Sequence, residues 1–183
     1  MICGNAYLGD TVPELSRRIM SVSSQIITTE VLGEELTRQM MPAGYCIEDC
    51  NYLLDYYRIT ADHRLLFGGG VVYTGHEPAD IKKRLWPHVL KTFPMLEGRK
   101  IDFAWSGNFA LTLTRMPHVG RLTNKIYFIQ GDSGHGVTTT HLLGKILGEI
   151  RELTRKHGAT LTVPLGLVDA EGRSIPEFPL LVQ

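Results

Sequence analysis

The sequence has no excess of charge of either sign. Its 183 residues include 19 basic and 19 acidic side chains, and the basic ones are spread along the chain. Proteins that bind nucleic acid or anionic membranes usually carry a clustered basic patch. We therefore expect no nucleic acid and no membrane among the partners.

Long apolar runs are also missing. No stretch approaches the roughly 18 apolar residues that a membrane-spanning helix needs, and the opening residues, MICGNAYLGD, contain no basic region of the kind found in secretory leaders. These absences predict a cytoplasmic protein. Because the chain opens directly on an apolar segment, we also expect it to begin in the middle of a larger fold.

Cysteine is scarce, with three residues at Cys3, Cys46 and Cys50. Cys46 and Cys50 form a C-x3-C pair, but no second pair and no histidine at a zinc-finger spacing accompanies them, so no metal site is expected. Buried, reduced thiols of a cytosolic protein are the simpler interpretation.

The pattern of apolar, β-branched and turn residues predicts several strands. They are expected at residues 1–8, 21–30, 51–59, 64–67, 101–114 and 125–130. The strands at residues 51–59 and 64–67 should form an antiparallel pair, with a turn at residues 60–63. The glycines at 68–70 should end the strand that precedes them, either as a simple turn or as the floor of a pocket.

Helices are expected between these strands, which makes the fold α+β. Residues 30–41 contain helix formers, and a helix starting near Glu77 should be kinked or ended by Pro87. The clearest helix covers residues 136–157, because apolar residues recur there at three- and four-residue spacing and form one stripe. The stripe consists of Leu143, Ile146, Leu147, Ile150 and Leu153.

Small residues fill the turn before this last helix, from Gly131 to Val137. Such a turn lets backbone N–H groups and the positive end of a helix face an anion or a carbonyl, although a tight turn without ligand fits the pattern as well. The GDSG in this segment also occurs around the nucleophile of trypsin-like proteases. A helix directly after Ser133 and the lack of the histidine context of that family argue against a protease.

Several ordered segments together resemble one known family. They are RLLFGGG (64–70), AWSG (104–107), TRMPHVGRL (114–122), IYFIQGDSGHGV (126–137) and LLGK (142–145), and CGNAYLG (3–9) precedes them. In this order they resemble the second half of the D-amino acid oxidase superfamily of FAD-dependent oxidoreductases, and within it they are similar to gamma-glutamylputrescine oxidoreductases.

The resemblance implies an organisation for the chain. Residues 1–9 would be the last strand of an FAD-binding domain, and residues 10–100 would belong to an antiparallel or mixed sheet with flanking helices that binds substrate. Residues 101–158 would supply the flavin-edge strands and the C-terminal helix. Residues 159–183 would be a divergent tail, for which the sequence predicts no structure.

The resemblance also implies which residues hold FAD. Those around the S-G-H-G turn would lie at the N1/C2 carbonyl edge of the flavin, two from the P-x-x-G loop would lie beside the ring, and two near the start of the chain would lie near the ribose and phosphates. They are Gly131, Ser133, Gly134, His135, Gly136, Val137 and Thr138, then Pro117 and Gly120, then Gly4 and Asn5. For His118 and His135, a packing or capping role stands beside proton transfer, and no catalytic residue is assigned.

One departure from the family concerns the substrate. Amino-acid oxidases of this superfamily carry an arginine for the substrate carboxylate two residues after the W-x-G glycine, where this chain has Phe109. Without that bidentate partner, a small-molecule amine is a better substrate than an α-amino acid. Phe109, Trp105 and Tyr73 are expected to form the walls around the reacting carbon.

A second departure concerns the cofactor. The sequence contains no G-x-G-x-x-G turn, which is the site of the FAD pyrophosphate in this superfamily. Two interpretations follow: a partial FAD-dependent amine oxidoreductase completed by another chain that carries the Rossmann half, or a non-catalytic folded remnant or interaction module without FAD. Either predicts weak or no FAD binding by this chain alone and an exposed apolar face bordered by Ile2, Ala6 and Tyr7.

Overall fold

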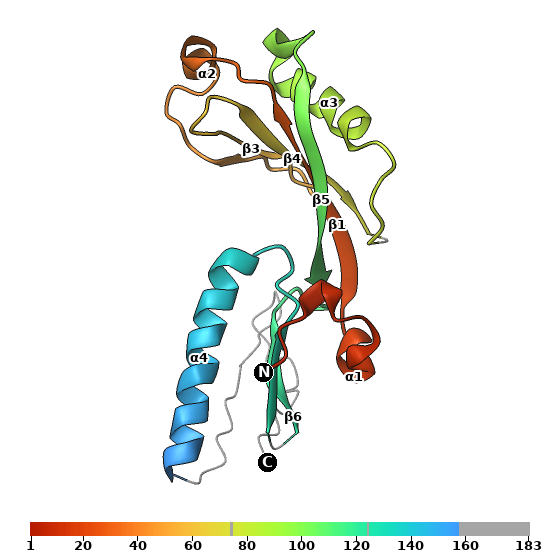
Figure 1. Cartoon of the computed structure of the whole chain (residues 1–183), viewed down its shortest axis with the longest axis vertical. Helices are drawn as coiled ribbons and strands as arrows, with labels where there is room; N and C mark the ends of the chain where they lie inside the picture. The colour runs from red at the N-terminus through yellow and green to blue at the C-terminus, as the bar shows by residue number, and fades with distance from the viewer. Residues whose placement is uncertain (74, 124, 158–183) are drawn as a thin grey trace. The chain divides into compact units, whose positions relative to one another are not determined.

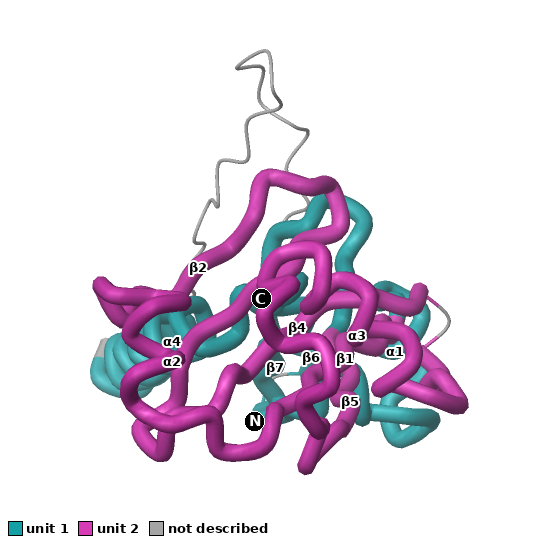
Figure 2. Tube along the Cα trace, turned by 90° about the horizontal axis from the view of Figure 1, so that it is seen from above, with its two compact units in different colours: residues 1–20, 110–183 teal, residues 21–109 magenta. Residues whose placement is uncertain are grey.

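The computed structural model describes residues 1–73, 75–123 and 125–157 (Figure 1). The described chain divides into two compact units, which Figure 2 colours separately. Unit 1 contains residues 1–20 together with the residues from Ala110 onward, and unit 2 contains Ser21–Phe109. The expected divergent tail at 159–183 lies outside the described residues. None of the described helices is long and apolar enough to span a membrane.

Unit 2 is built on a five-stranded sheet with the strand order β2-β3-β4-β1-β5. Its strands are β1 (Met20–Thr29), β2 (Ile47–Glu48), β3 (Tyr56–Ile59), β4 (Leu65–Val72) and β5 (Ile101–Leu111). The β1–β4, β2–β3 and β3–β4 pairs are antiparallel. The expected turn after β3 is confirmed, since the N–H of His63 donates to the carbonyl of Thr60 at 3.0 Å.

Helix α3 (Ile81–Thr92) packs on this sheet and closes the main core. Ile81, Leu85 and Val89 recur at four-residue spacing on its buried face and meet Leu65 and Phe67 of β4. The helix begins after Asp80, whose side chain accepts the N–H of Lys83 at 2.9 Å, so the expected start near Glu77 is a few residues early. Pro87 lies inside the helix and does not end it. The buried face continues on both sides of Pro87, with Leu85 before it and Val89 after it.

The three glycines of β4 do not form the turn that the sequence predicts. The strand continues through them to Val72. A Cβ on Gly68 would lie 2.1 Å from Cε2 of Tyr56, and a Cβ on Gly69 would lie 2.3 Å from Oδ1 of Asp55. Glycine is needed here because the side chains of Tyr56, in β3, and of Asp55, just before it, lie directly against β4. Ser24 of β1 lies on the far side of Gly68, with its hydroxyl 3.1 Å from the hydroxyl of Tyr56.

Unit 1 combines a two-stranded antiparallel sheet with a long helix. The strands are β6 (His118–Thr123) and β7 (Ile126–Gln130), and the helix is α4 (Gly136–His157). The predicted bounds of α4 are confirmed, and those of β7 are correct to one residue. The sequence does not predict strand β6 (His118–Thr123), because its first residues, 118–120, are expected in the P-x-x-G loop. The described part of the chain also has short helices at α1 (Pro13–Ser16) and α2 (Glu34–Met40).

The strand predicted at residues 1–8 is wrong. Only Ile2 pairs, in a parallel bridge with Phe128 of β7. The chain then turns at Gly4 into a short 3₁₀ helix, η1 (Asn5–Tyr7), with Asn5 at a φ of 45°. The prediction failed because an apolar composition does not reveal a helical turn whose backbone is fixed by distant residues.

One further expectation needs correction. Cys3, Cys46 and Cys50 are exposed free thiols rather than buried ones. The apolar stripe of α4 is only partly covered: Leu147 is buried, whereas Leu153 is 47% exposed. Tyr7, expected at the border of an exposed apolar face, is 71% exposed.

Candidate functional site

The turn between β7 and α4 has an unusual backbone that its residues make possible. Gly131, Ser133 and Gly134 have φ values of 75°, 52° and 93°. A Cβ on Gly131 would lie 2.2 Å from Cγ2 of Thr112, so only glycine fits there. Three left-handed residues within four positions reverse the chain sharply and place the first turn of α4 at the surface.

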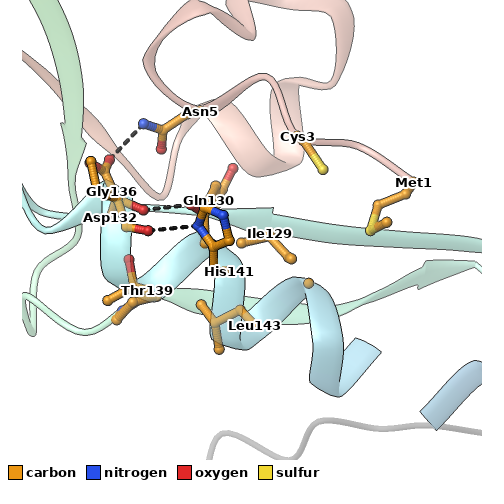
Figure 3. A pocket seen from close by; sticks show the side chains of 14 residues that line it. Met1, Cys3, Asn5, Ile129, Gln130, Asp132, Gly136, Thr139, His141 and Leu143 are labelled. Atoms are coloured by element: carbon orange, nitrogen blue, oxygen red, sulfur yellow. Dashed lines mark hydrogen bonds between the residues drawn. The ribbon is translucent and has the colours of Figure 1, made fainter. Parts of the chain in front are cut away.

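Asn5 holds this turn from a distant part of the sequence. Its Nδ2 donates to Oδ1 of Asp132 at 2.6 Å, and its Oδ1 accepts the N–H of Gly131 at 2.8 Å. The same Asp132 oxygen lies 3.4 Å from the N–H of Ala110. Figure 3 shows the Asn5 side chain directed at Asp132. Both polar atoms of the Asn5 side chain are therefore used inside the chain.

Ser133 fixes the other side of the turn. It is 7% exposed, and its N–H donates to the carbonyl of Ala110 at 2.9 Å. Its hydroxyl donates to the carbonyl of Gly131 at 3.3 Å. A serine buried in this way holds the turn to the end of β5, and its hydroxyl is not presented to solvent as a protease nucleophile would be.

The first turn of α4 remains open. Gly134 and His135 are exposed, and Val137 is 85% exposed. The first N–H groups of any helix lack intrahelical partners, and here they belong to Gly136, Val137 and Thr138. Side chains are absent at positions 134 and 136, so a ligand atom can approach the backbone. This donor set fits a carbonyl or anionic edge such as that of a flavin ring.

A groove of about 550 Å³ adjoins the open turn within unit 1 (Figure 3). It is lined by the start of the chain, by Pro117, by the end of β7 and by the first two turns of α4. Asn5, Asp132, Gly136 and Val137, which the turn brings together, all contribute to it. Gly4 lies beside it as the residue that precedes η1, where a Cβ would approach Leu8 at 3.0 Å.

The remaining predicted residues of unit 1 lie on β6. Gly120 is buried and pairs with Phe128, while His118 is half-buried and pairs with Gln130. Burial lowers the pKa of His118 below its ordinary value, and the positive charge of Arg18 lowers it further. His118 is thus held towards its neutral form.

His135 directly precedes α4, and its side chain is exposed. The backbone carbonyl of His135 accepts the N–H of Thr139 at 3.2 Å.

The predicted substrate residues belong to unit 2. Trp105 is 41% exposed and Phe109 half-buried, and both are on β5. They lie four residues apart, so they share one face of the strand with Gly107 between them. A Cβ on Gly107 would meet no atom within 4 Å, which leaves open space between the two rings. Tyr73 follows β4 and is 39% exposed.

Asp132 lies in the predicted turn, but the sequence alone assigns it no role. An acidic residue shortly before a helix that starts with glycine is a capping signal, and that signal was available. Its pairing with Asn5 was not, because nothing local joins the two positions. Among the described residues, no group of three or more histidine, cysteine or acidic side chains is arranged to hold a metal ion.

Comparison with known proteins agrees with this geometry. The chain is 59% identical over 151 residues to gamma-glutamylputrescine oxidoreductase of Escherichia coli (strain K12), which covers 82% of this chain and 35% of that protein. It is 40% identical over 154 residues to the probable oxidoreductase OrdL of Haemophilus influenzae, with 81% and 35% covered. The chain thus spans about 35% of the length of these curated relatives.

Solved structures show the same fold. Iminodiacetate oxidase from Chelativorans sp. BNC1 superimposes with a TM-score of 0.61 at 16% identity, covering 86% of this chain and 40% of that one. Glycine oxidase from Geobacillus kaustophilus gives a TM-score of 0.59 at 16% identity, covering 74% and 35%. Residues 1–150 match the family described as FAD dependent oxidoreductase, and the chain therefore belongs to that family.

Proposed function

We propose that this chain supplies the flavin-edge and substrate-side parts of an FAD-dependent enzyme that oxidises an amine similar to gamma-glutamylputrescine. The observation that supports this most directly is the open first turn of α4, tied to β7 by Asn5 and Asp132. The relative from Escherichia coli, 59% identical in this region, carries that substrate in its name.

FAD, when bound, supplies the hydride acceptor for amine oxidation. The role of α4 is to stabilise the negative charge that develops at the N1/C2 carbonyl edge, through the N–H groups of Gly136, Val137 and Thr138 and the positive end of the helix. Gly134 and His135 would flank that edge, with Gly131 and Ser133 holding the turn. Pro117 and Gly120 would lie beside the ring. Gly4 and Asn5 would be on the ribose and phosphate side, and Asn5 would offer only backbone atoms there because its side chain is already bonded.

The substrate-side residues select an amine. Phe109, Trp105 and Tyr73 offer apolar and aromatic surface and no cation, so they exclude water from the reacting carbon and give no partner to a carboxylate on it. Burying an unpaired carboxylate costs on the order of several kcal/mol, which lowers turnover of α-amino acids strongly. Three free thiols in the described chain fit a reducing, cytoplasmic setting for this activity.

The test is reconstitution. The chain is mixed with FAD and with a shortened form of the Escherichia coli relative, from which the segment that matches this chain has been removed. We expect a yellow complex that contains FAD. Under anaerobic conditions, gamma-glutamylputrescine should reduce the flavin and bleach its absorbance at about 450 nm. A complex that holds FAD but is not reduced by any amine would contradict the proposal.

A second candidate is a non-catalytic folded module. This candidate is suggested by the absence of a G-x-G-x-x-G turn from the 183 residues. It predicts that the chain folds and stays colourless with or without the complementary polypeptide. Flavin absorbance therefore discriminates between the two candidates, and the chain alone is expected to be colourless under both.

A further inference from the structure

Strand β4 contains one residue more than its partner β1 near the end of their pairing. Gln25 of β1 opposes Gly69 of β4 in the antiparallel register. Two residues earlier on β1, Ser23 opposes Val72, which is three residues later on β4. The extra residue makes a β-bulge. Gly70 lies within it with a φ of 61°, the left-handed backbone that glycine supplies in one common type of bulge.

Ser23 is on the face of the sheet that α3 covers. It is fully buried, and Nε2 of Gln25 donates to its hydroxyl at 3.0 Å, so the two side chains are on the same face. A Cβ on Gly70 would lie 3.1 Å from Oε1 of Gln25 and 3.0 Å from Cδ2 of Leu85 in α3. Gln25, and with it Ser23, is therefore directed towards the helix.

The bulge decides which face of the sheet carries Tyr73. Directly opposed residues of an antiparallel pair share a face, so Val72 is on the α3 face with Ser23. Successive side chains alternate between faces, which puts Tyr73 on the opposite face. Without the extra residue, Val71 would oppose Ser23, and Tyr73 would be on the α3 face. One inserted residue thus reverses the direction of the Tyr73 side chain.

Phe109 is on the same face as Tyr73. Ala104 of β5 packs against the core that α3 closes, so the odd-numbered position 109 faces away from the helix by alternation. A side chain of β5 also bonds to the segment after Tyr73: Nδ2 of Asn108 donates to the carbonyl of Gly75 at 3.0 Å. The strand that carries Phe109 is therefore joined to the segment that carries Tyr73.

Arg84 of α3 bonds to the bulge from the helix side. Its Nε donates to the carbonyl of Gly70 at 3.0 Å, and its Nη2 lies 3.4 Å from the carbonyl of Val71. A bulge interrupts the regular hydrogen bonds of the strand pair, and a guanidinium offers several donors in one rigid plane. Arg84 therefore supplies donors to two successive carbonyls where the strand pairing is irregular.

We propose that Arg84 is a positioning residue for the substrate site. It holds the bulge at Gly70 and Val71, and the bulge directs Tyr73 to the face that carries Phe109. This inference rests on the proposed function, which places Tyr73 and Phe109 around the reacting carbon. Arg84 itself is on the other side of the sheet and acts through the backbone of β4. Loss of its hydrogen bonds lets β4 move towards the regular register, in which Tyr73 faces α3.

The first experiment uses the whole chain alone, labelled with 3-fluorotyrosine and studied by fluorine NMR. The Tyr73 signal is identified by its absence in Tyr73→Phe. Arg84→Met removes the donors and keeps an unbranched side chain at an exposed position, so the variant keeps its fold. We expect the Tyr73 signal to move or to split in two. Lys83→Met makes the same change at the preceding exposed position and should leave the signal in place.

The second experiment measures kcat/KM for gamma-glutamylputrescine in the reconstituted enzyme. Arg84→Met should lower it roughly fivefold, the effect expected from losing about one net hydrogen bond. Tyr73→Ala should lower it as well. Because Arg84 acts through Tyr73, the double variant should be no worse than Tyr73→Ala alone. Lys83→Met should match the wild type.

An unchanged Tyr73 signal in Arg84→Met, or the same change in Lys83→Met, would overturn the inference. An active enzyme in which the losses from Arg84→Met and Tyr73→Ala multiply would also overturn it, because the two residues would then act independently. The NMR result separates this inference from the proposed function. A Tyr73 signal that moves as expected, together with a reconstituted wild type that oxidises no amine, removes the proposed function and leaves the Arg84 contact as the support of the bulge.

Discussion

Asn5 donates a hydrogen bond of 2.6 Å to Asp132, although 127 positions separate the two residues. The same amide accepts the N–H of Gly131, so one side chain joins the first turn of the molecule to the start of α4. Asp132 is in turn close to the helix start, since a Cβ on Gly136 would lie 2.8 Å from its Oδ2. The position of the open helix end therefore depends on residues 1–5 as much as on the glycine-rich turn itself.

Asn5→Ala should loosen this turn specifically. The substitution leaves the Gly131 N–H and the Asp132 carboxylate without their partner, which costs about 1–3 kcal/mol for a part-buried group. Hydrogen–deuterium exchange of peptides covering residues 126–141 measures the effect, and their exchange should accelerate accordingly. Asn51→Ala, which removes an exposed amide that donates to the Asp49 carboxylate in unit 2, is the control and should leave these peptides unchanged. Equal exchange in wild type and Asn5→Ala would refute the link.

Gly68→Ala should destabilise unit 2, because its Cβ would lie 2.1 Å from the Tyr56 ring and neither β3 nor β4 can move without disturbing the core. Overpacking of this kind costs about 1–3 kcal/mol. Urea unfolding followed by tryptophan fluorescence reports it, since Trp86 and Trp105 both belong to unit 2. Gly107→Ala, with open space at its Cβ, is the matched control and should stay within about 0.5 kcal/mol of wild type.

The elements that the sequence predicted best are those with a complete local pattern. Helix α4 combines a glycine-rich start with a regular apolar stripe, and β1 is a long run of β-branched and small residues. Both have the predicted position to within one residue, because the apolar spacing of α4 and the β-branched composition of β1 are local signals. The mixed α+β class and the resemblance to FAD-dependent oxidoreductases are also confirmed. Both predictions depend on several ordered segments rather than on one residue.

What the sequence did not reveal depends on contacts between distant residues. The glycines of β4 resemble a turn until Tyr56 and Asp55 are placed against them. Residues 1–8 resemble a strand until Asn5 bonds to Asp132 and Gly131. In each case a local propensity is overridden by a tertiary contact. The roles of the flavin-edge and substrate residues stay predictions.

The stability of unit 1 should depend on His118 below neutral pH. Burial and the charge of Arg18 lower its pKa in the folded protein, so the unfolded chain, with a pKa near the ordinary value of about 6.5, takes up the proton first. The free energy of unfolding should thus decrease as pH falls through about 6.5, until the pH is below the folded pKa. The measurement is hydrogen–deuterium exchange of peptides covering β6 and β7 between pH 8 and pH 5. Their protection factors should decrease as the pH falls through about 6.5.

His118→Gln should flatten that pH dependence, and Arg18→Gln should reduce it, because one of the two causes of the low pKa is removed. Arg17→Gln removes a neighbouring positive charge that does not figure among the causes of the shift and serves as the control. If His118→Gln keeps the full pH dependence between pH 8 and pH 5, another group is responsible for it.

Phe109 should decide whether the reconstituted enzyme accepts a carboxylate next to the reacting carbon. The wild type should oxidise gamma-glutamylputrescine with a far higher kcat/KM than D-alanine or glycine, since Phe109 offers no cation to their carboxylates. Phe109→Arg places a guanidinium at that position, where it can bind a carboxylate through two hydrogen bonds. We expect kcat/KM for D-alanine or glycine to rise roughly tenfold or more and that for gamma-glutamylputrescine to fall. Phe109→Leu keeps the position apolar and is the control, with no gain for either amino acid. Comparable kcat/KM values of the wild type for D-alanine and gamma-glutamylputrescine would show that Phe109 does not set the substrate class.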